Sequence, residues 1–189
     1  MNADLLVYQA KAFYNAYIAL DQLSRDDSDT LLLLFAPLVV NGAFSVELAL
    51  KAILAKNQIE YGKEHNLLIL FQMLPKSFQQ ELWAYLIEKA PEYAGFEKGL
   101  DELILLSNAF VDWRYAFEGK PVPSIESRFL AAFANAAVHT MFSYYNADLL
   151  PATKTESNNE IEQRFHENRE KCKEINLKMI QKKTKEHQL

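Results

Sequence analysis

The sequence predicts an all-α protein, an up-and-down bundle of four to six helices with a C-terminal helical extension. Apolar residues recur at three- and four-residue spacing in successive segments, as on one face of a helix. Residues 31–56 are apolar on nearly every side of one long helix, and no strand-like alternation or hairpin turn signal competes with helix. Half of the 189 residues are hydrophobic, which is enough for a sizeable core.

The first helix is expected at residues 5–23 and is amphipathic. Its apolar positions are Leu6, Ala10, Phe13, Tyr17 and Leu20. The central helix, residues 31–56, needs neighbours on several sides because its apolar positions exceed the usual one-third stripe. Pro37 allows two interpretations. It lies in the first turn of this helix, where proline is tolerated, or it kinks a helix that began at residues 28–30.

Glu47 and Lys51 stand four residues apart on the same side of the central helix. A buried carboxylate is costly unless it is paired, so Glu47 requires a partner. One interpretation is a pair with Lys51 that reaches water at the rim of the bundle. The other is a pair with Arg114, which would join the two longest core helices because an arginine fork suits a buried carboxylate.

Shorter helices should follow the central one. His65, Asn66 and Leu67 open a helix that Pro75 closes, and we expect His65 to cap it or to bond the preceding loop. Ser77 then caps another helix, with Gln80 in the capping-box position.

The second half of the bundle begins after an irregular connection marked by Pro91, Gly95 and Gly99. A second long core helix is expected at residues 100–117, ending at Gly119. Ser124 is expected to cap the last helix, whose alanines allow a neighbouring helix to approach closely.

Composition divides the chain into a helical bundle, residues 1–151, and a polar tail, residues 152–189. The tail carries nine Lys and Arg against seven Asp and Glu, whereas residues 1–151 carry 11 against 18. Apolar residues of the tail follow a four-three spacing, so it is a helix that docks on the bundle or pairs with a second chain, or else it is a solvated extension.

Several classes of protein are disfavoured. A net charge of −5 argues against a broad phosphate-binding surface. The single cysteine, Cys172, excludes an internal disulfide, and the scattered histidines predict neither a metal site nor a cofactor. The N-terminus does not look like a signal peptide, and the apolar run at residues 31–40 is about half of a membrane span. We therefore expect a cytoplasmic protein that does not contact a membrane.

Three motifs occur in order along the bundle: N-x-x-F-S-V-E-L-A-L-K-A-I-L at residues 41–54, E-H-N-L-L-I-L-F-Q-M-L at residues 64–74, and F-V-D-W-R-Y-A-F-E-G at residues 110–119. In these motifs the chain resembles bacterial proteins of the HEPN superfamily, over most of its first 150 residues. The resemblance implies a bundle of four or five helices that is frequently a homodimer. It also implies a role as an RNase, as an RNA- or nucleotide-binding partner, or as a component of a toxin–antitoxin, phage-defence or stress system.

The nucleases of that superfamily share an arginine followed four to six residues later by histidine. No arginine of this chain has a histidine at that distance. The nearest pattern is in the last helix, where Asn135 and His139 are kept but Ala134 replaces the arginine. Loss of the guanidinium removes the cation that would bind the phosphate during RNA cleavage.

The leading interpretation is therefore a non-catalytic HEPN-like binding or interaction module, with RNA, a nucleotide or another protein as its partner. The alternative is a metal-independent endoribonuclease with an atypical site, in which His139 acts with Arg114 or Arg128.

Candidate binding residues are Glu47, Lys51, Arg114 and His139. Arg114 and Lys51 could present a small cationic pocket to a phosphate. His139 lies on a polar stripe with Asn135, and this stripe either lines a dimer groove or ligand cleft or is a partly exposed face.

Overall fold

The computed structural model describes residues 3–25, 28–115, 118 and 124–145, and these form an all-α bundle, as predicted. All of them belong to one compact unit, Met1–Ala147. The predicted tail, residues 152–189, lies outside the described residues. The elements are α1 (Ala3–Ser24), α2 (Ser28–Lys56), α3 (Leu67–Met73), α4 (Lys76–Lys89), η1 (Pro91–Tyr93), α5 (Phe96–Leu106), α6 (Ala109–Arg114) and α7 (Ser127–Tyr145).

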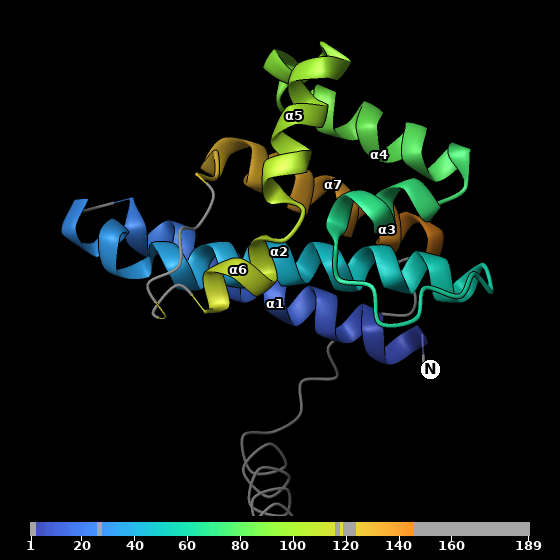
Figure 1. The fold of residues 1–189 in the computed structure, drawn as a ribbon, viewed down its shortest axis with the longest axis horizontal. Helices are drawn as coiled ribbons and strands as arrows, with labels where there is room; N and C mark the ends of the chain where they lie inside the picture. Colours follow the sequence, from blue (N-terminus) through green and yellow to red (C-terminus); the bar gives the residue numbers. More distant parts are fainter. Residues whose placement is uncertain (1–2, 26–27, 116–117, 119–123, 146–189) are drawn as a thin grey trace, which may run out of the picture. The chain divides into compact units, whose positions relative to one another are not determined.

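Helix α2 is the central element, with α1, α3, α6 and α7 packed around it (Figure 1). Seven of its apolar side chains have no exposed surface: Ala43, Val46, Ala49, Leu50, Ala52, Ile53 and Leu54. The helix begins at Ser28, so Pro37 lies inside it and not in its first turn. The segment Leu33–Lys56 is long and apolar enough to cross a membrane, but neighbouring helices bury more than half of its most apolar window, as expected for a core helix.

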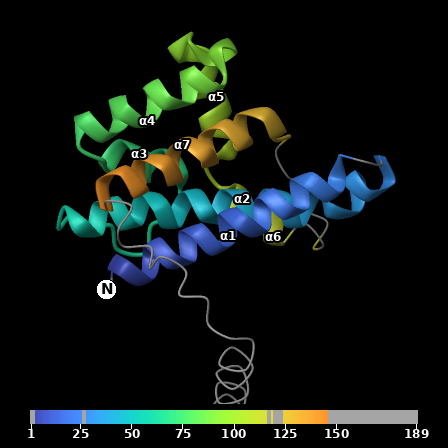
Figure 2. The same ribbon diagram turned by 180° about the vertical axis from the view of Figure 1, so that it is seen from behind.

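Gly42 allows α1 and α7 to approach α2 closely. A Cβ atom at this position would lie 3.0 Å from Tyr17 of α1 and 3.1 Å from Leu130 of α7. Helices α1 and α7 therefore flank the same part of α2, and Figure 2 shows both of them in front of it. This arrangement brings residues near the two ends of the bundle sequence side by side.

The predicted long helix at residues 100–117 is wrong, because α5 ends at Leu106 and α6 begins at Ala109. The carbonyl oxygen of Ser107, in the break, accepts a hydrogen bond of 2.8 Å from the backbone N–H of Leu67. Asn66 Nδ2 also donates to Asn108 Oδ1 at 3.1 Å. The break thus satisfies an N–H at the start of α3 that would otherwise have no partner.

Two predicted helix caps are also wrong. The carbonyl of Pro75 accepts from Phe78 and Gln79, so α4 starts at Lys76 and Ser77 lies inside its first turn. The carbonyl of Glu126 accepts from Leu130, so α7 starts at Ser127, three residues beyond Ser124.

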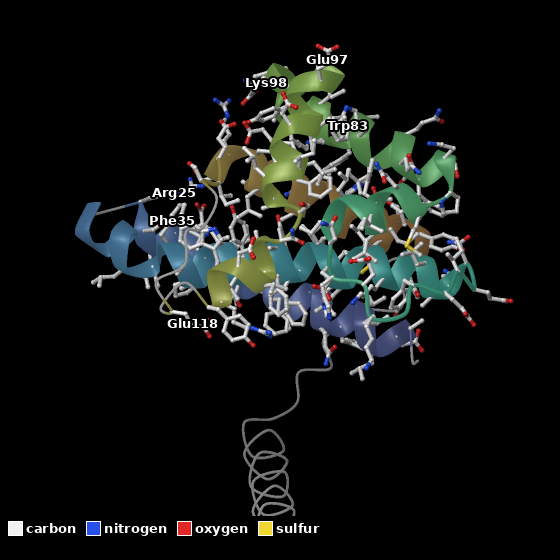
Figure 3. The ribbon with its side chains drawn as sticks, in the orientation of Figure 1. Arg25, Phe35, Trp83, Glu97, Lys98 and Glu118 are labelled. Atoms are coloured by element: carbon white, nitrogen blue, oxygen red, sulfur yellow. The ribbon has the colours of Figure 1, made fainter. Side chains whose placement is uncertain are left out.

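Helices α4 and α5 meet through Trp83 and Gly99. Figure 3 shows Trp83 between these two helices. A Cβ atom at position 99 would lie 2.6 Å from the Trp83 ring, so only glycine lets the indole approach α5 this closely. Gly99 therefore belongs to a packed helix and not to the irregular connection predicted there.

Buried tyrosines should make the fold sensitive to alkaline pH. Burial raises the pKa of Tyr145 to about 12, and it raises the pKa values of Tyr17 and Tyr93 as well. Tyrosines of the unfolded chain lose their protons at about pH 10, as in model peptides. Above that pH the folded state therefore binds more protons than the unfolded state. Stability should be complete below pH ~10 and should fall as the pH rises towards 12.

Urea unfolding followed by circular dichroism at several pH values between 8 and 12 measures this decline. Tyr145 Oη donates to the carbonyl of Ala52 at 2.9 Å, so Tyr145→Phe removes one titrating group and should flatten the curve. A urea midpoint that stays constant to the upper end of this range would contradict the prediction.

Candidate functional site

A polar cluster, hereafter the polar centre, consists of the buried Glu47 and Lys51 and the half-exposed His65. Lys51 Nζ lies 2.8 Å from Glu47 Oε1, and His65 Nδ1 lies 2.9 Å from the same oxygen. The Glu47 carboxylate is 2% exposed and Lys51 9%, whereas His65 is half exposed. Of the two predicted partners of Glu47, Lys51 is therefore the correct one, although the pair is buried and does not reach the rim.

His65 is the member of the polar centre that sequence reasoning assigned wrongly. Asn66 caps α3, because its Oδ1 accepts from the N–H of Ile69 at 3.1 Å, and the His65 ring turns back to α2 instead. A carboxylate can only accept, so His65 Nδ1 carries the proton of this hydrogen bond. The other carboxylate oxygen, Glu47 Oε2, is buried and accepts no hydrogen bond from the described residues. The polar centre thus fixes the loop before α3 to the core.

Arg114 does not belong to the polar centre. Its NH2 group donates to Tyr115 Oη at 2.8 Å, and its guanidinium lies over the rings of Phe110 and Tyr115. The predicted pair of Arg114 with Glu47 is therefore wrong, because stacking on two aromatic rings holds the guanidinium at the surface of α6. Lys51 instead faces the ring of Tyr61, whose pKa is raised by burial. A cationic pocket shared by Lys51 and Arg114 stays a prediction.

Two neighbouring surface hollows lie along α7, one beside α1 and one beside the end of α4, and we call the pair the α7 groove. Its first half is a hollow of about 260 Å³ lined by Lys11, Tyr14, Asn15, Asn135, Val138, His139 and Phe142. Its second half is a hollow of about 240 Å³ lined by Lys89, Ala90, Arg128, Ala131, Ala132 and Asn135. Asn135 lines both hollows, so the two lie next to each other along α7.

Asn135 and Tyr14 join α7 to α1 at the middle of the groove. Asn135 Nδ2 donates to Tyr14 Oη at 2.7 Å. Burial raises the pKa of Tyr14, although the hydrogen bond from Asn135 opposes part of this effect. The hydroxyl therefore keeps its proton at neutral pH and can donate it, while Asn135 Oδ1 can accept. These two atoms can fix the orientation of a polar ligand.

His139 lies on the exposed side of the groove and stacks on Tyr85 of α4. The ring centroids are 3.9 Å apart and the planes differ by 11°. Sequence analysis placed His139 and Asn135 on one stripe, and the structure places both in one hollow. The signal that sequence reasoning missed is Tyr85, which supplies a flat surface beside the imidazole.

Among the described residues, three cations border the groove: Lys11, Lys89 and Arg128. Lys11 Nζ lies 5.9 Å from the Phe142 ring. Lys89 pairs with Glu88, which raises the pKa of the lysine and lowers that of the glutamate, and Arg128 Nε lies 2.6 Å from Glu92. The groove can therefore attract phosphate, and its own carboxylates limit how many phosphates it can hold.

Within the part of the chain that the structure describes, no guanidinium lies beside the imidazole of His139. No arginine lines the half of the groove that holds His139, as far as the described residues extend. Arg128 precedes His139 by 11 residues of one helix, about 16 Å along its axis. Ala134, which replaces the arginine of the nuclease pattern, has no exposed surface. The groove thus holds the Asn and His of that pattern without its cation.

Comparison with known proteins gives one match. Residues 38–124 match the family model of the HEPN domain, which includes α3, α4, α5, α6 and most of α2. Neither the curated proteins nor the solved structures gave a match.

Proposed function

We propose, from the chain's membership of the HEPN superfamily through residues 38–124, that this protein is a non-catalytic binding module. The superfamily comprises nucleases and RNA-related modules. The ligand-binding site is the α7 groove, and the module acts in the cytoplasm as a homodimer. It serves a toxin–antitoxin, phage-defence or other RNA-related system.

The observation that carries this proposal is the environment of His139 and Ala134. RNA cleavage through a 2′-hydroxyl needs an acid or base near neutral pH and a cation on the phosphate. His139 can serve as the acid or base, but the buried Ala134 stands where the pattern has its cation. The alternative function, an endoribonuclease, would require a second copy of the chain to place its Arg128 beside His139. The Arg128 side chain is largely exposed.

The ligand that best fits the groove is a nucleotide or a short single-stranded RNA. One face of the His139 ring stacks on Tyr85, and its other face and the ring of Phe142 offer flat surfaces to a base. The Tyr14 hydroxyl and Asn135 Oδ1 can bond its polar edge, and the bordering cations can bind phosphate. The acidic composition of residues 1–151 disfavours a long duplex.

Binding can be measured by fluorescence anisotropy with a labelled single-stranded RNA and with ATP as competitor. His139→Ala and Asn135→Ala should each raise Kd about tenfold, since each loses a contact worth ~1.4 kcal/mol. If the groove binds about three phosphates, the logarithm of the association constant should fall against the logarithm of the salt concentration with a slope of about −2. The matched control is Arg114→Ala, because that guanidinium lies over the rings of Phe110 and Tyr115 and lines neither hollow.

Two results would contradict the proposal. If neither RNA nor ATP binds, the groove does not serve a nucleotide ligand. If gel analysis shows that the wild-type protein cleaves the RNA and that His139→Ala abolishes cleavage, the protein is an endoribonuclease and its arginine comes from elsewhere.

A further inference from the structure

His139 is the side chain of the α7 groove whose charge can change near neutral pH. Histidine titrates between about pH 5 and 8, and among the described residues no other histidine lines either hollow. His139 is exposed, and one face of its ring stacks on Tyr85 at a centroid distance of 3.9 Å. Its ring edge is therefore within reach of a ligand in the hollow that it lines.

The charged and titratable groups around His139 keep their charges over that range. They come from the two helices beside α7: Lys11 and Tyr14 on α1, and Tyr85, Glu88 and Lys89 on α4. Lysine and tyrosine side chains change charge only at alkaline pH, and burial raises the pKa of Tyr14 further. A hydrogen bond with Lys89 lowers the pKa of Glu88, so this carboxylate stays ionised. Protonation of His139 is therefore the charge change that this hollow undergoes near neutral pH.

The surroundings of His139 accommodate its protonated ring. The planes of His139 and Tyr85 differ by 11°, and the π face of a tyrosine attracts a cation that lies over it. After the hydrogen bond and the charge of Lys89, the charge of His139 also contributes to the lowered pKa of Glu88, so the two side chains attract each other. Since lysines border the groove as well, an imidazolium adds to an existing positive edge, and a phosphate is the ligand group that balances it.

We infer that His139 binds a phosphate of the ligand as an imidazolium, so that the α7 groove holds its ligand more tightly as the pH falls from 8 to 6. The inference rests on the proposed function and adds the regulation of that site. An imidazolium donates from both ring nitrogens, whereas the neutral ring has one nitrogen that can only accept. Because the buried Ala134 supplies no guanidinium, part of the positive charge beside the ligand exists only while His139 is protonated.

The direction of the pH effect follows from proton linkage. The complex contains His139 with its proton, so binding at pH 8 includes the uptake of that proton, which weakens the complex. At pH 6 most of the free protein already carries the proton, and this cost is nearly absent. The affinity should therefore rise by about tenfold or more from pH 8 to pH 6.

Fluorescence anisotropy with the full chain at pH 8, 7 and 6 measures this effect. The probe is an oligouridylate with hydroxyl ends and a dye whose emission does not depend on pH, because neither its phosphodiesters nor its uracils titrate in this range. The Kd of the wild type should fall by about tenfold or more from pH 8 to pH 6. The salt dependence should also steepen, from a slope of about −2 at pH 8 to about −3 at pH 6, because one further cation contacts the phosphates.

His139→Phe keeps a flat ring beside Tyr85 but cannot take up a proton. Its Kd should change by less than about twofold between pH 8 and pH 6, and its salt slope should stay at about −2. Position 139 is exposed, so circular dichroism should show an unchanged helix content. His65→Ala is the matched control, because His65 bonds Glu47 and lines neither hollow, and it should keep the pH dependence of the wild type.

The outcomes separate this inference from the proposed function. RNA that binds equally well at pH 8 and pH 6 overturns the role of the imidazolium and leaves the groove as the binding site. A pH dependence that His139→Phe retains overturns it as well, because another group then takes up the proton. If the oligouridylate binds at neither pH, the proposed function fails and the inference fails with it.

Discussion

Glu47→Ala should lower the free energy of unfolding by about 3–5 kcal/mol, because it leaves the buried ammonium of Lys51 without its partner. For a chain of this size such a loss lowers Tm by roughly 10 °C. The measurement is thermal unfolding by circular dichroism, together with urea unfolding to obtain the free energy.

Two controls identify the cause of that loss. His65→Ala should cost less than about 1 kcal/mol, because the imidazole is half exposed. The double variant Glu47→Leu with Lys51→Met removes both charges and should unfold within about 1 kcal/mol of wild type. If Glu47→Ala were as stable as wild type, the polar centre would not be closed to water.

Ala134→Arg should prevent stable folding and should not restore a nuclease. It completes the arginine–histidine spacing in the sequence, but position 134 has no exposed surface, and a guanidinium there would be buried without a carboxylate. We expect a loss of about 4 kcal/mol or more, seen as insoluble protein or as a much lower Tm.

Ala131→Arg is the matched control. Position 131 is only partly buried and lines the groove, so the new guanidinium can reach water. This variant should change the free energy of unfolding by less than about 1 kcal/mol. A soluble Ala134→Arg protein that cleaves RNA would show that position 134 opens to a catalytic cleft, and the non-catalytic proposal would fail.

Periodicity predicted the helices that lie on the core but not their ends. Apolar residues continue at helical spacing from Leu106 through Phe110 to Trp113, so the break at Ser107 and Asn108 leaves no gap in the pattern. The break exists because the Ser107 carbonyl accepts from Leu67, 40 residues earlier in the chain. A local pattern of apolar residues cannot predict a hydrogen bond between segments that are distant in the sequence.

In the candidate sites, too, sequence spacing predicted contacts within one helix but not contacts between distant segments. The pair of Glu47 with Lys51 was predictable because both lie on one helix at four-residue spacing. His65 reaches Glu47 through a loop, and Tyr14 meets Asn135 across 121 residues of sequence, so neither contact follows from spacing. Stacking of Tyr85 on His139 also depends on how α4 crosses α7, which only packing determines.

Asn135 lines both hollows of the α7 groove, and its amide nitrogen donates to Tyr14 Oη of α1. A ligand that turns this amide in one hollow also changes the group that the other hollow presents. Two ligands bound side by side along α7 would therefore alter each other's affinity by the same factor.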